Sequence, residues 1–229
     1  MTGYSRPILR RKLSREQICA FYDKYAEFYD ALAERSEHPV LMATLEYLDA
    51  QAGERILEIG CGTGHALSRI AAATGTGGFA VGLDLSSGRL NRARSLAARE
   101  SGGNPAEFVR ADALHLPFHN ESFDAICTTF TIELFDTPEI PRLYDECRRV
   151  LRPGGRLAAA SLSEEGSHHW GRDAYEWVHQ HFPSLANCRP IYLLESLDES
   201  GFEIVQSKFM TVWLPMEVVL AAKPVPDLP

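Results

Sequence analysis

No stretch of this sequence approaches the roughly 20 consecutive apolar residues that a membrane-spanning helix needs, so we expect no integral membrane association. The first residues, "MTGYSRPILRRKLSREQ", are basic, but no apolar run of signal-peptide length follows them, which favours a cytoplasmic protein. Positive charge is also in deficit, because 31 acidic residues face 23 basic residues and the formal net charge is −8. Proteins that grip nucleic acid through its phosphates are usually basic, so we expect no nucleic-acid partner.

Cysteine is sparse and unpatterned. The five cysteines contain no CxxC pair; they are Cys19, Cys61, Cys127, Cys147 and Cys188. An odd, scattered set is typical of neither a disulfide framework nor a zinc site, so we expect ordinary packing thiols and no metal. The 229 residues, of which 45% are hydrophobic, suffice for one domain with a single core.

Strand-like and helix-like segments alternate through the middle of the chain. Short apolar runs predict strands at residues 55–59, 78–84, 106–112, 123–129 and 156–162. Helical patterns between several of them predict helices at residues 64–74, 86–100 and 137–151. Near-continuous apolar strands that alternate with helices indicate a parallel sheet covered on both faces, which is a doubly wound α/β fold.

The boundaries of these helices have local signals. Ser86 or Ser87 is the expected N-cap of the second helix. Thr137 is the expected N-cap of the third helix, with Pro138 at its first position. We expect "RPGG" at residues 152–155 to stop that helix and turn the chain into the next strand.

Two further helices are predicted before the α/β core. Ser14 and Gln17 have the spacing of a capping box at the start of a helix over residues 14–34. Pro39 opens a second helix, which reaches about Leu48. These helices would form a cap on the amino-terminal side of the core.

The remaining segments complete one structural domain. Helical patterns cover residues 174–182 and 190–200, and strand patterns that would pair antiparallel cover residues 201–210 and 216–222. The predicted division is an N-terminal helical cap at residues 1–50, a main domain at 51–223 with substrate elements mainly within 163–200, and a frayed tail at 224–229.

The stretch "ILEIGCGTGHA" at residues 56–66 carries the strongest chemical signal. Gly60, Gly62 and Gly64 follow a strand and precede a helix, so a ligand could approach the backbone and the unpaired N–H groups of the helix. Dinucleotide-binding loops usually have the spacing GxGxxG, whereas this loop has GxGxG with Glu58 ahead of it. A phosphate-bearing ligand has no evident use for that carboxylate, but a ligand with a cationic amino group does.

Two more carboxylates end the next two predicted strands. Asp84 lies about twenty residues past the loop, where an acidic side chain can accept hydrogen bonds from both hydroxyls of a ribose. Asp112 could reach the exocyclic amine of an adenine, while Ala113 and Leu114 cover the face of the base. The alternative for both aspartates is a structural cap, and Glu58 could simply order the glycine loop.

These residues belong to a larger set of motifs. In order along the chain, "LEIGCGTG", "GLDLS", "RADALHLPF", "FDAICTTF" and "RRVLRPGGRL" resemble class I S-adenosylmethionine-dependent methyltransferases, above all the group typified by ubiquinone/menaquinone C-methyltransferases. The resemblance covers about residues 20–162. It implies a Rossmann-like methyltransferase fold with a seven-stranded, mostly parallel sheet of order 3-2-1-4-5-7-6, in which strand 7 is antiparallel. It also implies S-adenosyl-L-methionine as cofactor, S-adenosyl-L-homocysteine as product and a small-molecule methyl acceptor, such as a quinone precursor, a lipid or another metabolite.

The resemblance also assigns residues to the site. The implied cofactor site contains Tyr25, Tyr29, Glu58, Gly60, Cys61, Gly62, Gly64, Asp84, Leu85, Asp112, Ala113, Leu114 and Thr128. Cys61 is interpreted as a small packing residue of the loop, and the tyrosines could instead belong to an aromatic core stripe. No diagnostic catalytic residue is present; candidates for an acceptor contact or a base are His168, His169 and Glu133, and an exposed polar loop is the alternative.

Two other functions fit parts of the pattern. A non-catalytic S-adenosylmethionine-binding protein would keep the loop without turnover. A nicotinamide-dependent oxidoreductase would share the strand–glycine–helix unit and Asp84. The GxGxG spacing and the combination of Asp112 with "LRPGG" disfavour the oxidoreductase.

Overall fold

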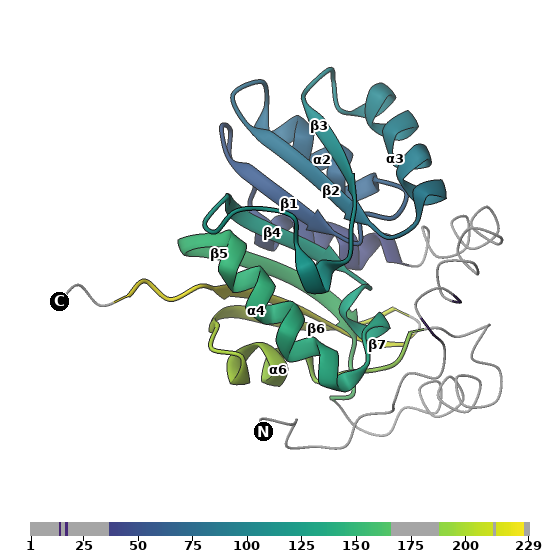
Figure 1. The fold of residues 1–229 in the computed structure, drawn as a ribbon. Helices are drawn as coiled ribbons and strands as arrows, with labels where there is room; N and C mark the ends of the chain where they lie inside the picture. Colours follow the sequence, from purple (N-terminus) through teal and green to yellow (C-terminus); the bar gives the residue numbers. More distant parts are fainter. Residues whose placement is uncertain (1–13, 15–16, 18–36, 166–187, 213, 227–229) are drawn as a thin grey trace.

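The computed structural model describes residues 14, 17, 37–165, 188–212 and 214–226, which carry the colours of the sequence in Figure 1. Their strands form one seven-stranded sheet with the order β3-β2-β1-β4-β5-β7-β6. The strands are β1 (Arg55–Ile59), β2 (Phe79–Asp84), β3 (Ala106–Arg110), β4 (Phe123–Thr129), β5 (Leu151–Leu162), β6 (Glu203–Thr211) and β7 (Pro215–Ala222). β7 is antiparallel to both of its neighbours, and the other neighbouring pairs are parallel. The implied strand order and the antiparallel seventh strand are therefore confirmed.

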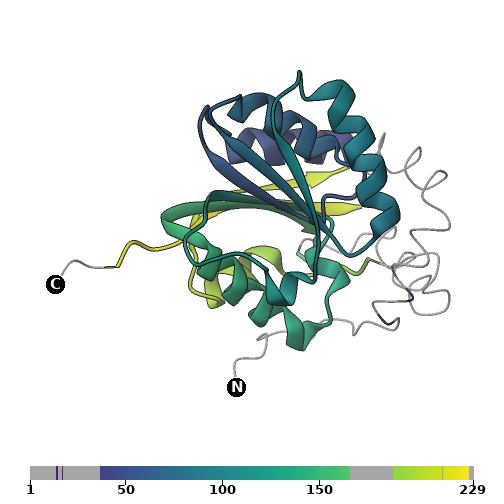
Figure 2. The ribbon, with the colours of Figure 1, turned by 45° about the horizontal axis from the view of Figure 1, so that its top comes forward.

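Helices cover both faces of this sheet, as the view along its layers shows (Figure 2). One face is covered by a helix at residues 37–48, by α2 (His65–Thr74) and by α3 (Ser87–Glu100), and the other by α4 (Ile140–Val150) and α6 (Leu193–Glu199). Successive strand residues serve opposite layers, because Ile56 packs in the cluster of Leu67 of α2 and Leu57 packs in the cluster of Leu143 of α4. The predicted doubly wound α/β fold is confirmed. None of the described helices has the length and the hydrophobicity that a bilayer span requires.

Two predicted helix caps are present. Ser14 and Gln17 make both bonds of a capping box, since the Ser14 N–H donates to Gln17 Oε1 at 2.8 Å and the Gln17 N–H donates to Ser14 Oγ at 3.3 Å. The rest of that predicted helix lies outside the described residues. Ser86 Oγ accepts from the N–H of Arg89 at 3.0 Å, so Ser86 rather than Ser87 caps α3.

The start of α4 differs from the prediction. Asp136, not Thr137, is the cap: its carboxylate accepts from the Thr137 N–H at 3.0 Å, and Glu139 Oε2 accepts from the Asp136 N–H at 2.9 Å. This pair opens a short 3₁₀ helix, η3 (Thr137–Glu139), which leads into α4. An aspartate with a glutamate three residues later satisfies two N–H groups with charged acceptors, which the hydroxyl of Thr137 alone could not do.

The "RPGG" segment follows the end of α4 but lies inside a strand rather than before one. Phe123 of β4 pairs with Leu151, and the next pair joins Ala125 to Arg156, so residues 152–155 form a large bulge in β5. The strand therefore begins at Leu151 and not at the predicted residue 156. The helix does end before this segment, as predicted, but the segment interrupts β5 instead of preceding it, because β4 pairs with Leu151 as well as with Arg156.

Two other boundaries depend on pairing between distant segments. β3 stops at Arg110, which pairs with the last residue of β2, and not at the predicted residue 112. α6 is shorter than the predicted helix because Ile191 first pairs with Ser163 as an isolated β-bridge. The helix predicted at residues 174–182 lies outside the described residues.

Arg156 fastens three elements at the amino end of the sheet. Its guanidinium donates to both carboxylate oxygens of Glu54, each at 2.7 Å, and to the backbone oxygens of Leu48 at 2.6 Å and Asp49 at 2.9 Å. Burial alone would raise the pKa of Glu54, but the hydrogen bonds from Arg156 hold it below its usual value. One side chain thus joins β5 to the start of β1 and to the end of the 37–48 helix.

We expect Arg156→Met to lower the free energy of unfolding by about 2–4 kcal/mol, because it removes the charged donor from the largely buried carboxylate of Glu54 and from the backbone oxygens of Leu48 and Asp49. Arg152→Met is the matched control. Arg152 pairs with Asp124 at 2.6 Å, but its side chain is 54% exposed, so its loss should cost less than about 1 kcal/mol. Urea unfolding followed by circular dichroism measures both values, and equal losses would contradict the anchoring role of Arg156.

Candidate functional site

The glycine loop follows β1 and is fixed against the end of β2. The N–H groups of Gly60 and Cys61 both donate to the backbone oxygen of Leu83, at 2.7 and 3.0 Å. Gly60, Gly62 and Gly64 have φ values of +70°, +52° and +89°, which residues with side chains rarely adopt. The loop therefore turns sharply at the carboxyl end of the sheet and leads into the amino end of α2.

Space as well as backbone conformation requires glycine at two of these positions. A Cβ atom on Gly60 would lie 2.2 Å from Oγ1 of Thr131, and one on Gly64 would lie 2.9 Å from Cβ of Ala93. Neighbouring elements therefore pack directly onto the main chain of the loop. At the three glycines the loop has no side chain of its own, so other groups can approach its backbone closely.

Asp84 closes the loop from the neighbouring strand. Its Oδ2 accepts a hydrogen bond from the N–H of Gly62 at 3.0 Å, and its Oδ1 accepts one from the N–H of Ser86 at 2.8 Å. The capping role considered for Asp84 is therefore present. The carboxylate can still bind a ligand, because each of its oxygens can accept a second hydrogen bond and Asp84 remains 9% exposed.

Glu58 is a buried carboxyl group beneath the loop. It is 2% exposed, the N–H of Leu67 donates to it, and its Oε2 has no hydrogen-bond partner. Burial and the nearby charge of Asp84 raise the pKa of Glu58 from 4.5 to about 8. Such a group lacks a hydrogen-bond donor that a cationic amino group could supply.

Asp112 lies on the same edge of the sheet as Asp84, because β2 and β3 are neighbours. Its Oδ1 accepts from the N–H of Leu114 at 3.0 Å and caps the short helix η1 (Ala113–His115). The side chain of Asp112 is still 30% exposed, whereas Ala113 and Leu114 are buried. The structure thus brings the three predicted carboxylates to neighbouring strand ends, with an apolar surface beside the third.

The cysteines behave as packing residues. The four that the structure describes are free and buried: Cys61, Cys127, Cys147 and Cys188. Burial raises the pKa of the Cys61 thiol far above its usual value, with the charges of Glu58 and Asp84 acting in the same direction. A thiol that stays protonated is a poor nucleophile, so the position of Cys61 inside the loop carries no reactivity.

The structure describes two of the four remaining predicted cofactor residues. Leu85 follows the end of β2 and is partly exposed. Thr128 is buried near the end of β4, where it pairs with Ala159, and its Oγ1 has no hydrogen-bond partner. Tyr25 and Tyr29 lie outside the described residues.

Of the three candidates on the acceptor side, His168 and His169 lie outside the described residues, and Glu133 lies within them. Glu133 belongs to the short helix η2 (Ile132–Leu134), is fully buried, and accepts a hydrogen bond from the N–H of Leu162 at 3.4 Å. Burial raises its pKa to about 8. The structure therefore encloses Glu133 within the protein rather than presenting it at the surface.

Two residues that the motifs do not mark also contact the loop. Thr131, just after β4, crowds Gly60, and the guanidinium of Arg89 lies 3.7 Å from the position of a Cβ atom on Gly62. The sequence indicates that Arg89 and Ala93 share one face of α3, because they are four residues, about one helical turn, apart. Nothing local marks Thr131, because its contact comes from the packing of β4 beside β1.

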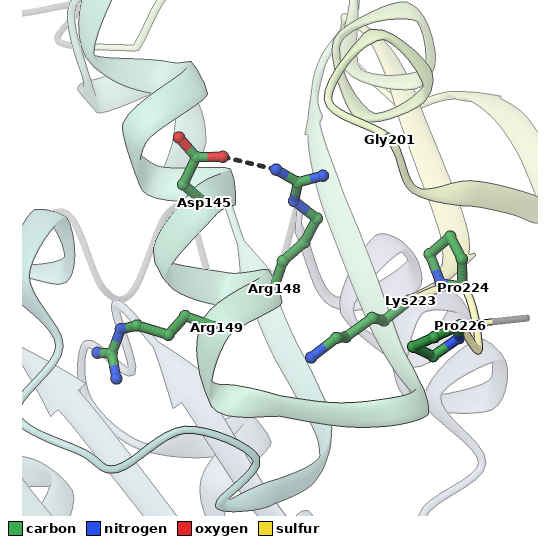
Figure 3. A pocket seen from close by; sticks show the side chains of 7 residues that line it. All are labelled: Asp145, Arg148, Arg149, Gly201, Lys223, Pro224 and Pro226. Atoms are coloured by element: carbon green, nitrogen blue, oxygen red, sulfur yellow. Dashed lines mark hydrogen bonds and ion pairs between the residues drawn. The ribbon is translucent and has the colours of Figure 1, made fainter. Parts of the chain in front are cut away.

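A separate hollow lies at the opposite, amino edge of the sheet, and Figure 3 shows its lining. Arg148, Arg149 and Lys223 make it basic. All three cations are engaged within the fold: Arg148 pairs with Asp145, Arg149 pairs with Glu146, and Lys223 donates to the backbone oxygen of Leu151, each at 2.7 Å. The arginines occupy the last turn of α4, where positive charge stabilises a helix, so we interpret the hollow as structural.

Known proteins share both the sequence pattern and the fold. A family model described as a methyltransferase domain matches residues 56–155. The chain is 35% identical over 162 residues to a demethylmenaquinone methyltransferase of Clavibacter sepedonicus. The matched region spans 68% of this chain and 63% of that protein, so the chain covers less than two thirds of the length of this relative. The crystal structure of the [4+2]-cyclase SpnF superposes with a TM-score of 0.75 at 19% identity, over 96% of this chain and 100% of that one. The N-methyltransferase NodS of Bradyrhizobium japonicum WM9, in complex with S-adenosyl-L-homocysteine, superposes with a TM-score of 0.64 at 16% identity, over 82% and 88%.

The raised pKa of Glu58 predicts a pH dependence of stability. Glu58 holds a proton in the folded protein that it releases on unfolding, so its contribution is complete below about pH 4.5 and is lost as the pH rises towards about 8. We expect Glu58→Gln to become more stable relative to the wild type across this range, by at most about 1.4 kcal/mol per pH unit. Thermal unfolding at a series of pH values measures the difference.

The control for this experiment is Glu146→Gln. The hydrogen bonds from Arg149 hold the pKa of Glu146 below its usual value, so this carboxylate is largely ionised in both the folded and the unfolded state once the pH exceeds about 5. Its replacement should change stability by a nearly constant amount above about pH 5. If the Glu58→Gln and wild-type curves run parallel as well, the burial of an uncharged Glu58 is refuted.

Proposed function

Because the chain belongs to the class I S-adenosylmethionine-dependent methyltransferases, we propose that it binds S-adenosyl-L-methionine and transfers the methyl group to a small molecule, with S-adenosyl-L-homocysteine as product. The proposal rests on one observation: the glycine loop and three carboxylates meet at the carboxyl edge of the sheet. Glu58, Asp84 and Asp112 follow one another on the adjacent strands β1, β2 and on the loop after β3. That order suits a ligand with an amino acid end, a ribose and an adenine.

The described residues fit this cofactor. The unpartnered Oε2 of Glu58 is a buried acceptor for its ammonium group, directly or through water. The second lone pairs of Asp84 suit the ribose hydroxyls. The exposed part of Asp112 suits the exocyclic amine of the adenine, with Ala113 and Leu114 against the base. Gly60 and Gly64 let Thr131 and Ala93 pack against the loop, which fixes its backbone beside the proposed ligand.

The chemistry then needs orientation more than a reactive side chain. When bound, S-adenosylmethionine supplies an electrophilic methyl group on a sulfonium. The protein has to align this group with the acceptor and to exclude water, and alignment alone can provide much of the rate. We place Thr128 near the methyl-transfer end, where its unpartnered Oγ1 can form a hydrogen bond. A general base is required only for an acceptor that must lose a proton.

We propose a quinone precursor or a similar small metabolite as the acceptor. The relative that is 35% identical bears the name demethylmenaquinone methyltransferase, which supports this class of acceptor. If the acceptor must lose a proton, His168 and His169 are better candidates for the base than Glu133, because Glu133 is fully buried. The formal net charge of −8 disfavours nucleic acid as the acceptor.

A non-catalytic S-adenosylmethionine-binding protein is the second candidate. It is favoured by one observation, namely that the described candidate for a base, Glu133, is enclosed while the cofactor edge is intact. A nicotinamide-dependent oxidoreductase is disfavoured, because Glu58 beneath a GxGxG loop opposes a phosphate-bearing cofactor. Assays of methyl transfer to demethylated quinones and related phenols separate the first two candidates.

The cofactor class is tested by calorimetric titration of the protein with S-adenosyl-L-homocysteine and with NADH. We expect binding of the first in the micromolar range and no binding of the second, because the site offers carboxylates to an ammonium group and to a ribose rather than donors to a pyrophosphate. Binding of NADH without binding of S-adenosyl-L-homocysteine would overturn the proposed function.

The ribose assignment is tested with Asp84→Asn, which keeps an oxygen acceptor for the loop but removes the charge. We expect the dissociation constant for S-adenosyl-L-homocysteine to rise about 10- to 100-fold, because two hydrogen bonds to a charged acceptor are weakened. The control is Asp145→Asn, since the side chain of Asp145 is 66% exposed and lies on α4. Equal affinities of Asp84→Asn and the control would remove Asp84 from the cofactor site.

A further inference from the structure

The face of α3 that meets the glycine loop carries a positive charge. Ala93 abuts Gly64, and Arg89, one turn earlier, places its guanidinium 3.7 Å from the Cβ position of Gly62. The backbone of Arg89 is held at the first turn of the helix by Ser86 Oγ, at 3.0 Å. Arg89 is partly buried, so its cation is built into the wall of the loop instead of extending into solvent.

The other ionisable side chains in this region are acidic. Glu58 and Asp84 both act on the Cys61 thiol by disfavouring its ionisation, and the charge of Arg89 acts on the same thiol in the opposite direction. The three ionisable side chains therefore share one neighbourhood around the loop. Arg89 opposes an electrostatic field that would otherwise attract cations more strongly.

We propose that Arg89 is a specificity-determining residue that sets how strongly the cofactor site distinguishes the methyl donor from the product. This inference rests on the proposed methyltransferase function. The two ligands differ only in the transferred methyl group, so the sulfur is a cationic sulfonium in the donor and a neutral thioether in the product. A cation beside the loop weakens binding of the sulfonium and leaves binding of the thioether nearly unchanged. Arg89 thereby brings the two affinities closer together and makes the protein responsive to the ratio of donor to product.

A supporting role for Arg89 predicts a different result. If the guanidinium only packed against Gly62, its removal would loosen the loop and weaken donor and product by the same factor. The ratio of the two dissociation constants would then stay constant. The ratio, rather than either affinity alone, therefore reports the electrostatic role.

The experiment measures dissociation constants for S-adenosyl-L-methionine, S-adenosyl-L-homocysteine and sinefungin, which carries an amine in place of the sulfonium, by calorimetry at fixed pH and low salt. The variants are Arg89→Met, Arg89→Gln as a second neutral replacement, and Arg89→Lys, which retains the charge. Arg99→Met, at the exposed last turn of the same helix, is the matched control. Circular dichroism establishes that each variant is folded.

In both neutral variants we expect the dissociation constants of S-adenosyl-L-methionine and sinefungin to fall relative to that of S-adenosyl-L-homocysteine. The change in this ratio from the wild type should be a factor on the order of five, as for one unit charge at moderate distance. Arg89→Lys and Arg99→Met should keep the wild-type ratio within about twofold. An unchanged ratio in the neutral variants, or an equal loss for all three ligands, overturns the inference while leaving the proposed function intact. Failure of the wild type to bind S-adenosyl-L-homocysteine overturns the proposed function, and the inference with it.

Discussion

The hydrogen bonds that fasten the glycine loop to the end of β2 are the constraint on which the rest of the site depends. Two N–H groups of the loop share the backbone oxygen of Leu83, and the N–H of Gly62 donates to Asp84. These bonds follow from the parallel pairing of β1 and β2 in a register that sets Ile59 beside Leu83. Once the loop is held in this way, it can turn only through left-handed backbone conformations, and α2 must begin where α3 already packs. The pairing of β1 with β2 thus brings Glu58, Asp84 and the start of α2 together, and the pairing of β2 with β3 adds Asp112.

Burial and pairing with arginine shift the pKa values of carboxyl groups in opposite directions in this protein. At the carboxyl edge, burial raises the pKa of Glu58 and of Glu133 to about 8 and that of Glu217 to about 7. Elsewhere, hydrogen bonds from arginines hold the pKa values of Glu54 and Glu146 below their usual values. Paired carboxylates stabilise the fold near neutral pH, whereas buried uncharged ones destabilise it as the pH rises. Glu58 and Glu133 therefore reduce the stability of the fold as the pH rises. Buried carboxyl groups with shifted pKa values are typical of functional sites.

The loop after β4 connects the glycine loop to the end of β5. Thr131 donates to the backbone oxygen of Thr129 at 2.9 Å, and its side chain crowds Gly60. Phe130 between them has a φ of +51°, a conformation that costs energy in a residue other than glycine and often occurs at functional sites. Glu133 follows at once and is enclosed against the end of β5. Direct contacts therefore join the glycine loop, the loop after β4 and the end of β5.

Local patterns in the sequence were sufficient wherever the determining residues are close along the chain. Strand and helix periodicity, the GxGxG spacing and the Ser14–Gln17 capping box depend on neighbours. The strand order and the cofactor class were implied by the resemblance of the ordered motifs to a known family. The tertiary structure decided the features that depend on segments far apart. Pairing with β4 turned residues 152–155 from a free turn into a bulge, and packing against β5 buried Glu133. Contact between α3 and the glycine loop placed the charge of Arg89 beside the site. Burial and electrostatic environment arise from which elements pack together, and a local pattern does not encode that.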